Sequence, residues 1–343
     1  MTRIGALLAA SVLLVANSTA GFAADDFYKG KTVKMMIGGS VGGSYDSHAR
    51  ILAKHMTKHI PGNPNIVAMQ MPAAAGLAAT NHLNAIALKD GTEFGLVNRY
   101  NLVAPLLGNE QAKYKVEEFN WLGTTASYSD DAYVFIIRAS LPQKTVDDLR
   151  SGKFAPLNVG NVGSAPIRVL EEANGIKLNV IEGYTGNDLD LAFERGEVDG
   201  HTVGYGNMLA RQSNWVSGGF IRTMVQFGRV TRLPALKDVP TSRELATNPN
   251  DLALVEFTEA PLTIAYPFVL PPGVPADRVA IMRKAFGDTV KDPDYLAEMK
   301  KANLETTPKS GAEIQETVNK LTKTPADVVK RYKDLSAGKA GGG

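Results

Sequence analysis

The sequence predicts an α/β protein of two lobes, each a mostly parallel sheet flanked by helices. Short apolar segments typical of strands alternate with segments whose apolar residues recur at helical spacing, which favours parallel strands joined by helices. With 343 residues, the chain exceeds what one hydrophobic core usually serves. Its C-terminal part is mainly helical, so we expect that part to pack back on the first lobe and to make that lobe discontinuous.

The first 23 residues have the pattern of an export signal. Arg3 supplies a positive charge, and residues 4–15 form an apolar stretch shorter than a membrane-spanning helix requires. Small residues at Gly21 and Ala23 favour cleavage after Ala23, and an uncleaved anchor is the alternative. The chain has no cysteine, so neither a disulfide nor a lipid-bearing cysteine is available. We therefore expect residues 1–23 to be a signal peptide and the mature protein to be free outside the cytoplasm.

In the first part of the chain, short apolar runs and helical spacings follow each other closely. Residues Val33-Lys34-Met35-Met36-Ile37, for example, form a run that suits a buried strand. The expected elements are a strand at 32–37, a helix at 45–59, a strand at 65–69, a helix at 77–87, a strand at 94–97, a short helix near 102–106 and a strand at 121–124.

The middle of the chain continues the alternation, and the end is helical. The expected strands are 132–137, 157–159, 178–181, 201–203, 221–227 and 262–270. The expected helices are 166–174, 187–195, 207–212, 276–290, 293–300, 311–320 and 325–335. We predict a first lobe of residues 25–125 and 228–336, a second lobe of residues 126–227, and a flexible tail of residues 337–343.

Ligands of open α/β sheets bind beyond the carboxyl ends of the strands. The loops that follow the expected strands should therefore converge on one cleft between the lobes. These loops are residues 38–44, 71–76, 98–101, 160–166, 183–187 and 203–206.

The loop Gly-Gly-Ser-Val-Gly-Gly-Ser at residues 38–44 joins a strand to a helix. Glycine lets the backbone approach a guest closely, and a helix start offers unpaired N–H groups with a partial positive charge. Ser44 stands where an N-cap belongs. Asp46, in the first helical turn, either complements the helix dipole or contacts a ligand, and both readings stay open. The candidate ligand-binding residues are Ser40, Val41, Gly42, Gly43 and Ser44.

A second strand–turn–helix junction of this kind precedes Pro166, a residue suited to a first helical turn. It supplies Asn161, Gly163, Ser164 and Ala165 as candidates, and the two junctions could hold one carboxylate from two sides. Further candidates follow other strands. They are Ala74 and Ala75, Arg99 and Tyr100, Tyr184 and Thr185, and Tyr205.

Arg99 would be the natural bidentate partner of a carboxylate, although a solvated surface arginine is an equal alternative. His55 and His59 have one metal-ligand spacing, but no third ligand is evident, so we expect no metal. The sequence also lacks the glycine patterns of nucleotide sites and the G-x-S-x-G elbow of hydrolases. We therefore expect no cofactor and no catalytic residue.

The chain carries 37 basic and 35 acidic residues, a net charge of +2, which gives no reason to expect nucleic acid as a partner. Any preference for an anion must therefore be local to the site.

The order of several short motifs resembles the periplasmic receptors of tripartite tricarboxylate transporters, the Bug receptor family. Val-Gly-Gly-Ser-Tyr-Asp-Ser-His-Ala-Arg at residues 41–50 is similar to the family pattern P-x-G-G-x-x-D-x-x-A-R without its proline. Leu-Lys-Asp-Val-Pro-Thr at residues 236–241 is similar to L-P-D-V-P-T. Further matching segments, in chain order, are residues 70–77, 89–96, 161–166, 184–186, 195–199 and 270–275.

This resemblance implies a two-lobed periplasmic binding protein fold of type II-like form, closing on a small carboxylated molecule in the interlobe cleft. It implies permease subunits of the transporter as partners, and we expect a monomer. The chain departs from the family pattern in the second loop, where two glycines are alanine, and at Pro166 and Arg99. The ligand could be a dicarboxylate, an aromatic acid or an amino acid.

We expect a solute receptor rather than an enzyme. Two alternatives remain at this point: an exported hydrolase or transferase on a similar scaffold, and an adaptor that presents its ligand to a membrane sensor kinase. The sequence does not separate transport from signalling.

Overall fold

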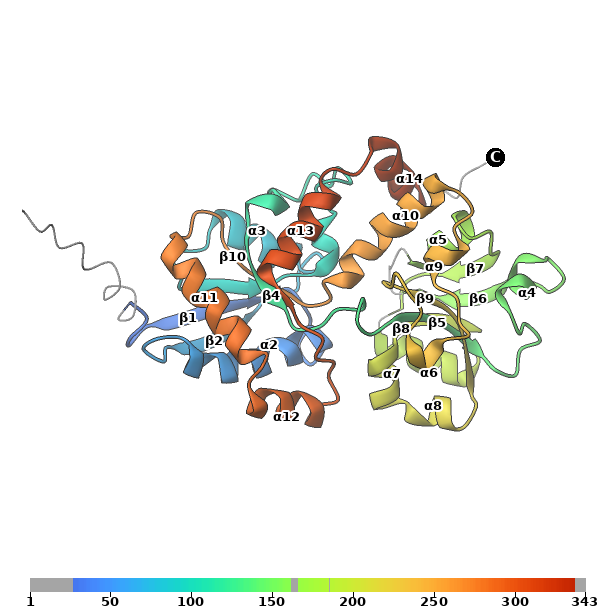
Figure 1. The fold of residues 1–343 in the computed structure, drawn as a ribbon, viewed down its shortest axis with the longest axis horizontal. Coiled ribbons are helices and arrows are strands. Elements are labelled where there is room, and N and C mark those ends of the chain that lie inside the picture. Colours follow the sequence, from blue (N-terminus) through green and yellow to red (C-terminus); the bar gives the residue numbers. More distant parts are fainter. Residues whose placement is uncertain (1–26, 162–165, 185, 337–343) are drawn as a thin grey trace, which may run out of the picture.

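The computed structural model describes residues 27–161, 166–184 and 186–336, and its strands form two sheets that lie side by side (Figure 1). The expected signal peptide, residues 1–23, and the expected tail, residues 337–343, lie outside the described residues. We call the six-stranded sheet with its helices the first lobe and the five-stranded sheet with its helices the second lobe.

The first lobe's sheet has the strand order β11-β4-β10-β3-β1-β2, and the second lobe's sheet has the order β7-β6-β8-β5-β9. The first sheet consists of β1 (Thr32–Ile37), β2 (Asn65–Gln70), β3 (Glu93–Leu96), β4 (Asn120–Thr124), β10 (Pro267–Leu270) and β11 (Lys309–Ser310). The second consists of β5 (Tyr133–Arg138), β6 (Leu157–Gly160), β7 (Leu178–Ile181), β8 (Gly200–Gly204) and β9 (Ile221–Phe227).

Both sheets are mixed, whereas we expected them to be mostly parallel. Strand β1 pairs in parallel with β2 and β3, and β6 pairs in parallel with β7 and β8. The other pairs, β10 with β3 and β4, β11 with β4, and β5 with β8 and β9, are antiparallel. Parallel neighbours need a crossover connection, usually a helix. Strands β4 and β5 instead carry the chain directly from one lobe into the other.

Helices cover both sheets. Around the first sheet lie α2 (Ser44–Met56), α3 (Leu77–Ala85), α11 (Ala276–Thr289), α12 (Pro293–Lys301) and α13 (Gly311–Leu321). Around the second lie α4 (Val146–Arg150), α5 (Pro166–Glu172), α6 (Gly186–Arg195), α7 (Tyr205–Arg211), α8 (Ser213–Ser217) and α9 (Ser242–Leu245). Short 3₁₀ helices are η1 (Thr57–His59), η2 (Arg99–Leu102), η3 (Val116–Glu118), η4 (Pro234–Leu236) and η5 (Ala260–Thr263).

Two helices, α10 (Pro249–Glu259) and α14 (Ala326–Ser336), connect the lobes on one side of the molecule (Figure 1). Their apolar side chains share one hydrophobic cluster with two residues of the second lobe: Val169, within α5, and Ala173, directly after it. Arg331 of α14 pairs with Glu172 of α5 at 3.0 Å and with Asp251 of α10 at 2.7 Å. The lobes are therefore tied by packing and charge as well as by the chain crossings.

The sequence did not predict α10, and the strand expected at 262–270 is shorter than expected. It begins at Pro267, and residues 260–263 form η5 instead. Leu262 and Ile264 are fully buried, but against the core rather than within a sheet. A short apolar run cannot by itself distinguish these two ways of burying side chains.

The lobe limits at residues 125 and 227 stay a prediction. The segment after β9 remains close to the second sheet, because the Gln226 side chain donates to the carbonyl oxygens of Leu236 and Val239 at 3.0 and 2.6 Å. Residues 27–161, 166–184 and 186–336 contain no helix with the length and apolar character needed to cross a membrane.

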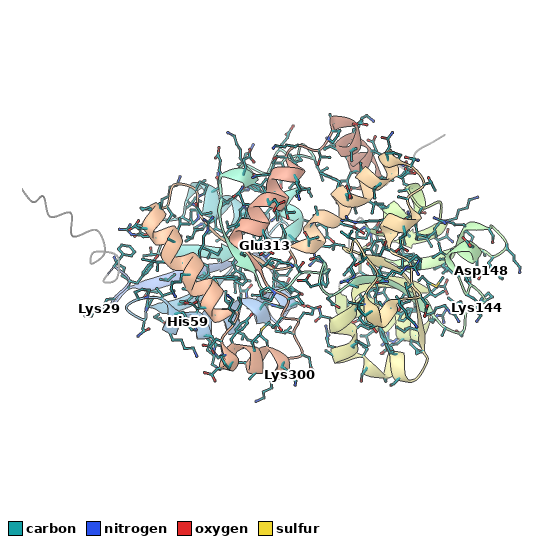
Figure 2. The ribbon with its side chains drawn as sticks, viewed as in Figure 1. Lys29, His59, Lys144, Asp148, Lys300 and Glu313 are labelled. Carbon is teal, nitrogen blue, oxygen red and sulfur yellow. The ribbon has the colours of Figure 1, made fainter. Side chains whose placement is uncertain are left out.

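Charged side chains project around the outside of both lobes (Figure 2). The labelled residues Lys29, Lys144, Asp148 and Lys300 all lie on this periphery, where water solvates them (Figure 2). Charged residues that are buried are the exception among the described residues; they include Asp46, Glu93, Arg229, Asp251, Glu259 and Asp292.

Candidate functional site

The candidate site lies at the junction of the lobes, beyond the carboxyl ends of the parallel strands. Gly38 follows β1, Val97 follows β3, Asn161 follows β6 and Tyr205 follows β8. This is the position at which open α/β sheets bind ligands. Side chains of both lobes and of the crossing segment meet there, as the following contacts show.

The first loop is braced by its own backbone. The Gly43 amide donates to the Ser40 carbonyl at 3.2 Å, and the Gly42 amide donates to the Asp46 carboxylate at 2.9 Å. Gly42 has φ +74°, a conformation that favours glycine. The N-cap of α2 is Gly43, not Ser44 as we expected, because Gly43 has extended backbone angles and Ser44 is already helical.

Asp46 holds the first loop in place, in addition to the two roles that the sequence suggested for it, complementing the helix dipole or contacting a ligand. Its carboxylate is buried and accepts hydrogen bonds from the Gly42 amide, from Arg50 Nε at 2.7 Å and from the Gln70 side chain. The amides of Gly42 and Gly43 therefore form hydrogen bonds within this segment in the structure. Ser40 and Val41 are exposed, and the Ser44 side chain lies beside the Tyr266 hydroxyl.

The second loop packs directly against the first. A β-carbon on Gly76 would collide with the Gly38 carbonyl, so the two loops touch backbone to backbone. Ala74 and Ala75 are exposed and adopt φ values of +52° and +54°, in the left-handed region. Alanine is strained in this region, and the two residues stand where the resembling family has glycine.

Arg99 is the candidate cation of the site. It begins η2, and its amide donates to the Tyr45 hydroxyl at 3.2 Å. Its guanidinium carbon lies 5.1 Å from the ring centroid of Tyr100 and 5.8 Å from that of Tyr128. Its Nε atom is closed to solvent and has no hydrogen-bond partner. A solvated surface arginine does not fit this environment.

Glu305 is a second charged group that the sequence did not indicate. It lies between α12 and β11, and both of its carboxyl oxygens are closed to solvent without a hydrogen-bond partner. A β-carbon on Gly204 of the second lobe would stand 3.0 Å from Glu305 Oε1 and 3.0 Å from the Tyr128 hydroxyl oxygen. Burial, together with the nearby Asp131 and against the opposing effect of Arg99, raises the pKa of Glu305 to about 8.

We call Arg99, Tyr100, Tyr128, Tyr266 and Glu305 the junction cluster. Its wall is held by His48, whose ring stacks on Tyr266 at 3.7 Å between centroids and whose Nδ1 lies 2.8 Å from the Thr125 hydroxyl. Burial lowers the pKa of His48 to about 3, so this histidine is neutral at physiological pH. The cluster joins segments that are far apart in the sequence, which is why no motif marked it.

The second-lobe candidates are only partly described. Asn161 is buried, its side chain donates to Glu182 at 3.0 and 3.1 Å, and its amide bonds the Ile181 carbonyl. Tyr184 is half-buried against Gly160, and Tyr205 is half-buried at the start of α7. Gly163, Ser164, Ala165 and Thr185 lie outside the described residues.

The two histidines with metal-ligand spacing have a structural role. His55 Nε2 lies 2.7 Å from Glu298, and His59 Nε2 lies 2.8 Å from Asp292, so both attach α2 and η1 to the helix α12 region. In the part of the chain that the structure describes, no three metal-ligating side chains gather.

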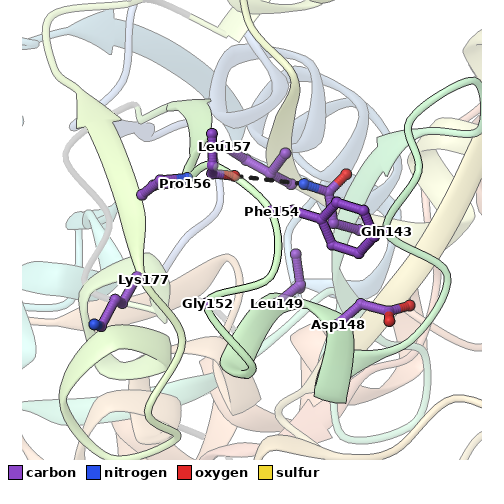
Figure 3. Close-up of a pocket in the computed structure, with 9 residues that line it drawn as sticks. Gln143, Asp148, Leu149, Gly152, Phe154, Pro156, Leu157 and Lys177 are labelled. Atoms are coloured by element: carbon purple, nitrogen blue, oxygen red, sulfur yellow. Dashed lines mark hydrogen bonds between the residues drawn. The ribbon is translucent and has the colours of Figure 1, made fainter.

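A hollow of about 250 Å³ in the second lobe is not part of this site (Figure 3). Leu149, Phe154 and Leu157 form its apolar lining, and Gln143 donates to the Ala155 carbonyl at its edge. Leu157 is the first residue of β6, so the hollow lies at the amino end of that strand, away from the junction cluster.

Comparison with solved structures identifies the fold. A TctC solute-binding protein from Polaromonas has a TM-score of 0.66 and 20% identity, over 91% of this chain and 99% of its own. The periplasmic binding protein BugD has a TM-score of 0.63 and 20% identity, over 91% and 98%. MatC from Rhodopseudomonas palustris, solved with bound malate, has a TM-score of 0.59 and 20% identity, over 89% and 99%.

The chain has the fold of the TctC and Bug solute-binding proteins. The match covers nearly all of both chains, so the expected two-lobed binding-protein fold is confirmed. No family model matches the sequence, and the search of curated proteins found no match. At this level of identity the likeness establishes the fold, and the function must be argued from the site.

Proposed function

We propose that the protein is a periplasmic receptor that captures a small carboxylated molecule and delivers it to a tripartite tricarboxylate-type permease. The observation that carries this proposal is the position of Arg99, half-buried among tyrosines beyond the carboxyl end of a parallel strand, where open α/β sheets bind ligands. A guanidinium stays charged and offers a fork of donors that matches a carboxylate. The bound malate of MatC supports the same class of ligand.

Binding would be coupled to closure, because a ligand at the junction cluster touches residues of both lobes. Tyr128 belongs to the segment that crosses between the sheets, and Gly204 to the second lobe, while Arg99 belongs to the first. A ligand shifts an open–closed equilibrium only through contacts that differ between the two states. The α10 and α14 helices tie the lobes on one side, so closure would take place around them.

Thermal unfolding of the mature protein against a panel of mono-, di- and tricarboxylates tests this proposal. A ligand at 100 times its dissociation constant adds about 2.7 kcal/mol to the free energy of unfolding. Calorimetry and product analysis then follow for each stabilising compound. We expect saturable binding without consumption of the ligand. Sustained turnover, or no stabilisation by any carboxylate, would show that the proposal is wrong.

A further inference from the structure

Arg99 and Glu305 belong to one half-buried cluster but do not pair with each other. Both adjoin Tyr128: the guanidinium carbon lies 5.8 Å from its ring centroid, and Glu305 Oε1 shares with its hydroxyl the space beside Gly204. Among residues 27–161, 166–184 and 186–336, neither side chain has an ion pair within 4.0 Å. A polar or charged group that is closed to water without a hydrogen-bond partner is costly, so the Arg99 Nε atom and the Glu305 carboxyl oxygens are each short of a partner.

The surroundings of Glu305 are acidic and tyrosine-rich. The groups that face it are Tyr128 and Asp131 of the crossing segment, Tyr266 before β10, Arg99 of η2 and the Asn207 amide of α7, which lies nearby without hydrogen-bonding geometry. Asp131 is itself held by the Gly206 amide at 2.9 Å. Arg99 is the cation among these groups, but its guanidinium forms no ion pair with the Glu305 carboxyl group.

Two glycines of the second lobe lie directly against these carboxyl groups. A β-carbon on Gly204 would reach Glu305 Oε1 and Tyr128, and a β-carbon on Gly206 would stand 3.0 Å from Asp131 Oδ2 and 3.4 Å from Glu305 Cγ. Side chains at these positions would therefore collide with Glu305, Asp131 or Tyr128, so the two glycines let the backbone of the second lobe pack closely against both carboxyl groups. The second lobe instead presents bare backbone to them.

We propose that the ligand is a carboxylate that also carries a protonated nitrogen, with its carboxylate on Arg99 and its ammonium group on Glu305. This inference rests on the proposed receptor function and narrows its ligand class. A dipolar ligand supplies both missing partners at once: its carboxylate pairs with Arg99, and its ammonium group pairs with Glu305. A second carboxylate at the Glu305 end would instead be placed beside Asp131, where like charges repel.

The proposed binding step releases a proton from Glu305. In the free protein Glu305 holds a proton at neutral pH, because burial raises its pKa to about 8. When the ammonium group arrives, Glu305 releases that proton to the buffer and pairs as a carboxylate, while the ligand keeps its own proton. Binding therefore releases up to one proton, and affinity rises by up to about tenfold per pH unit below pH 8.

Calorimetry at pH 7 with matched ligand pairs tests the inference: glutamate against glutarate, aspartate against succinate, and γ-aminobutyrate against butyrate. Each titration is run in two buffers of different ionisation enthalpy, which counts the protons released. We expect the amino member of at least one pair to bind about tenfold tighter or more and to release close to one proton.

The variant Glu305→Gln keeps the shape of the side chain but cannot become anionic. We expect it to lose both the preference for the amino member and the proton release, while thermal unfolding shows that it is folded. Glu298→Gln is the matched control, because Glu298 lies on α12 and pairs with Lys54 and His55 of α2, away from the junction cluster, and this variant should keep both properties.

The failures of the two proposals are distinguishable. If the plain acids bind as well as or better than their amino counterparts and release no proton, Glu305 keeps its proton and donates it to an acid oxygen. This inference is then wrong, although the receptor function stands. If no carboxylate binds with or without an amino group, the receptor function itself fails. Retention of the amino preference in Glu305→Gln would also overturn the inference.

Discussion

The Asp46 carboxylate holds the backbone amide of Gly42 at 2.9 Å, so an acidic side chain braces the loop that is proposed to face an anion. The same carboxylate also accepts from Arg50 and Gln70, which disperses its negative charge. Its position in the first turn of α2 complements the helix dipole in addition. The loop geometry therefore depends on a residue that need not touch the ligand.

We predict that Asp46→Ala lowers the free energy of unfolding by about 1–3 kcal/mol, because donors gathered around a buried acceptor lose their partner. Urea denaturation measures this change. Asp294→Ala is the control, since Asp294 is 77% exposed and pairs with Lys58 at the surface, and it should change stability by about 0.5 kcal/mol or less. Equal effects of the two substitutions would contradict the bracing role of Asp46.

The strained second loop gives a prediction of opposite sign. Left-handed alanine costs about 1–2 kcal/mol, and the extra chain entropy of glycine takes back about 0.4–1 kcal/mol. Ala74→Gly and Ala75→Gly should therefore each raise the free energy of unfolding by about 0.5–1 kcal/mol. Ala73→Gly, at a position without positive φ, should lower it slightly. Destabilisation by all three substitutions would show that the loop is not strained.

Several strands rich in β-branched and other apolar residues were predictable from the sequence. The expected ranges 32–37, 178–181 and 221–227 agree with β1, β7 and β9 residue by residue, since burial and β-propensity point the same way there. Strand direction was not predictable from the alternation alone. It depends on where the chain crosses between lobes, as β4 and β5 show.

The helix α10 was missed although its start carries a local signal. Asn248 accepts from the Asp251 amide at 3.0 Å, and Pro249 occupies the first turn. Its helical periodicity is weak because the helix is buried on more than one side between the lobes. The pair Asn248-Pro249, an N-cap followed by a first-turn proline, would have indicated the start of α10.

The candidate site was predictable only where a local motif builds it. The glycines of the first loop and Arg99 follow strand ends and could be found by that rule. Tyr128, Tyr266 and Glu305 come from three distant segments, and only tertiary folding brings them together. Glu305 has no sequence signal, because an acidic residue in a polar segment between Lys301 and Lys309 resembles any solvated surface group.

Arg99 provides a direct test of how the anion is held. Arg99→Ala should weaken carboxylate binding by about 1.5–3 kcal/mol, the usual contribution of a hydrogen bond to a charged group. Arg99→Lys should recover part of the loss, because an ammonium group cannot reproduce the bidentate fork. Arg195→Ala, at a residue 68% exposed on α6, should leave affinity unchanged. Calorimetric affinities that are equal in Arg99→Ala and wild type would assign the anion to amides and hydroxyls alone.

Glu305 should also make the free energy of unfolding depend on pH, lowering it as the pH rises. Its pKa is raised by burial to about 8 in the folded protein, against an ordinary value of 4.5 in the unfolded chain. Between these two values unfolding releases a proton, so a rise in pH favours the unfolded state. The free energy of unfolding then falls by up to about 1.4 kcal/mol per pH unit in this window.

Glu305→Gln removes this titration, so its stability relative to wild type should increase from pH 5 to pH 8 and stay constant above that. His48 acts in the opposite direction but over a lower window, between its folded pKa of about 3 and its ordinary value of 6.5. Urea denaturation at pH 6.5, 7.3 and 8 therefore isolates the effect of Glu305. Stability differences that do not change over this range would mean that Glu305 is already ionised in the free protein, and that its carboxylate finds a partner before any ligand arrives.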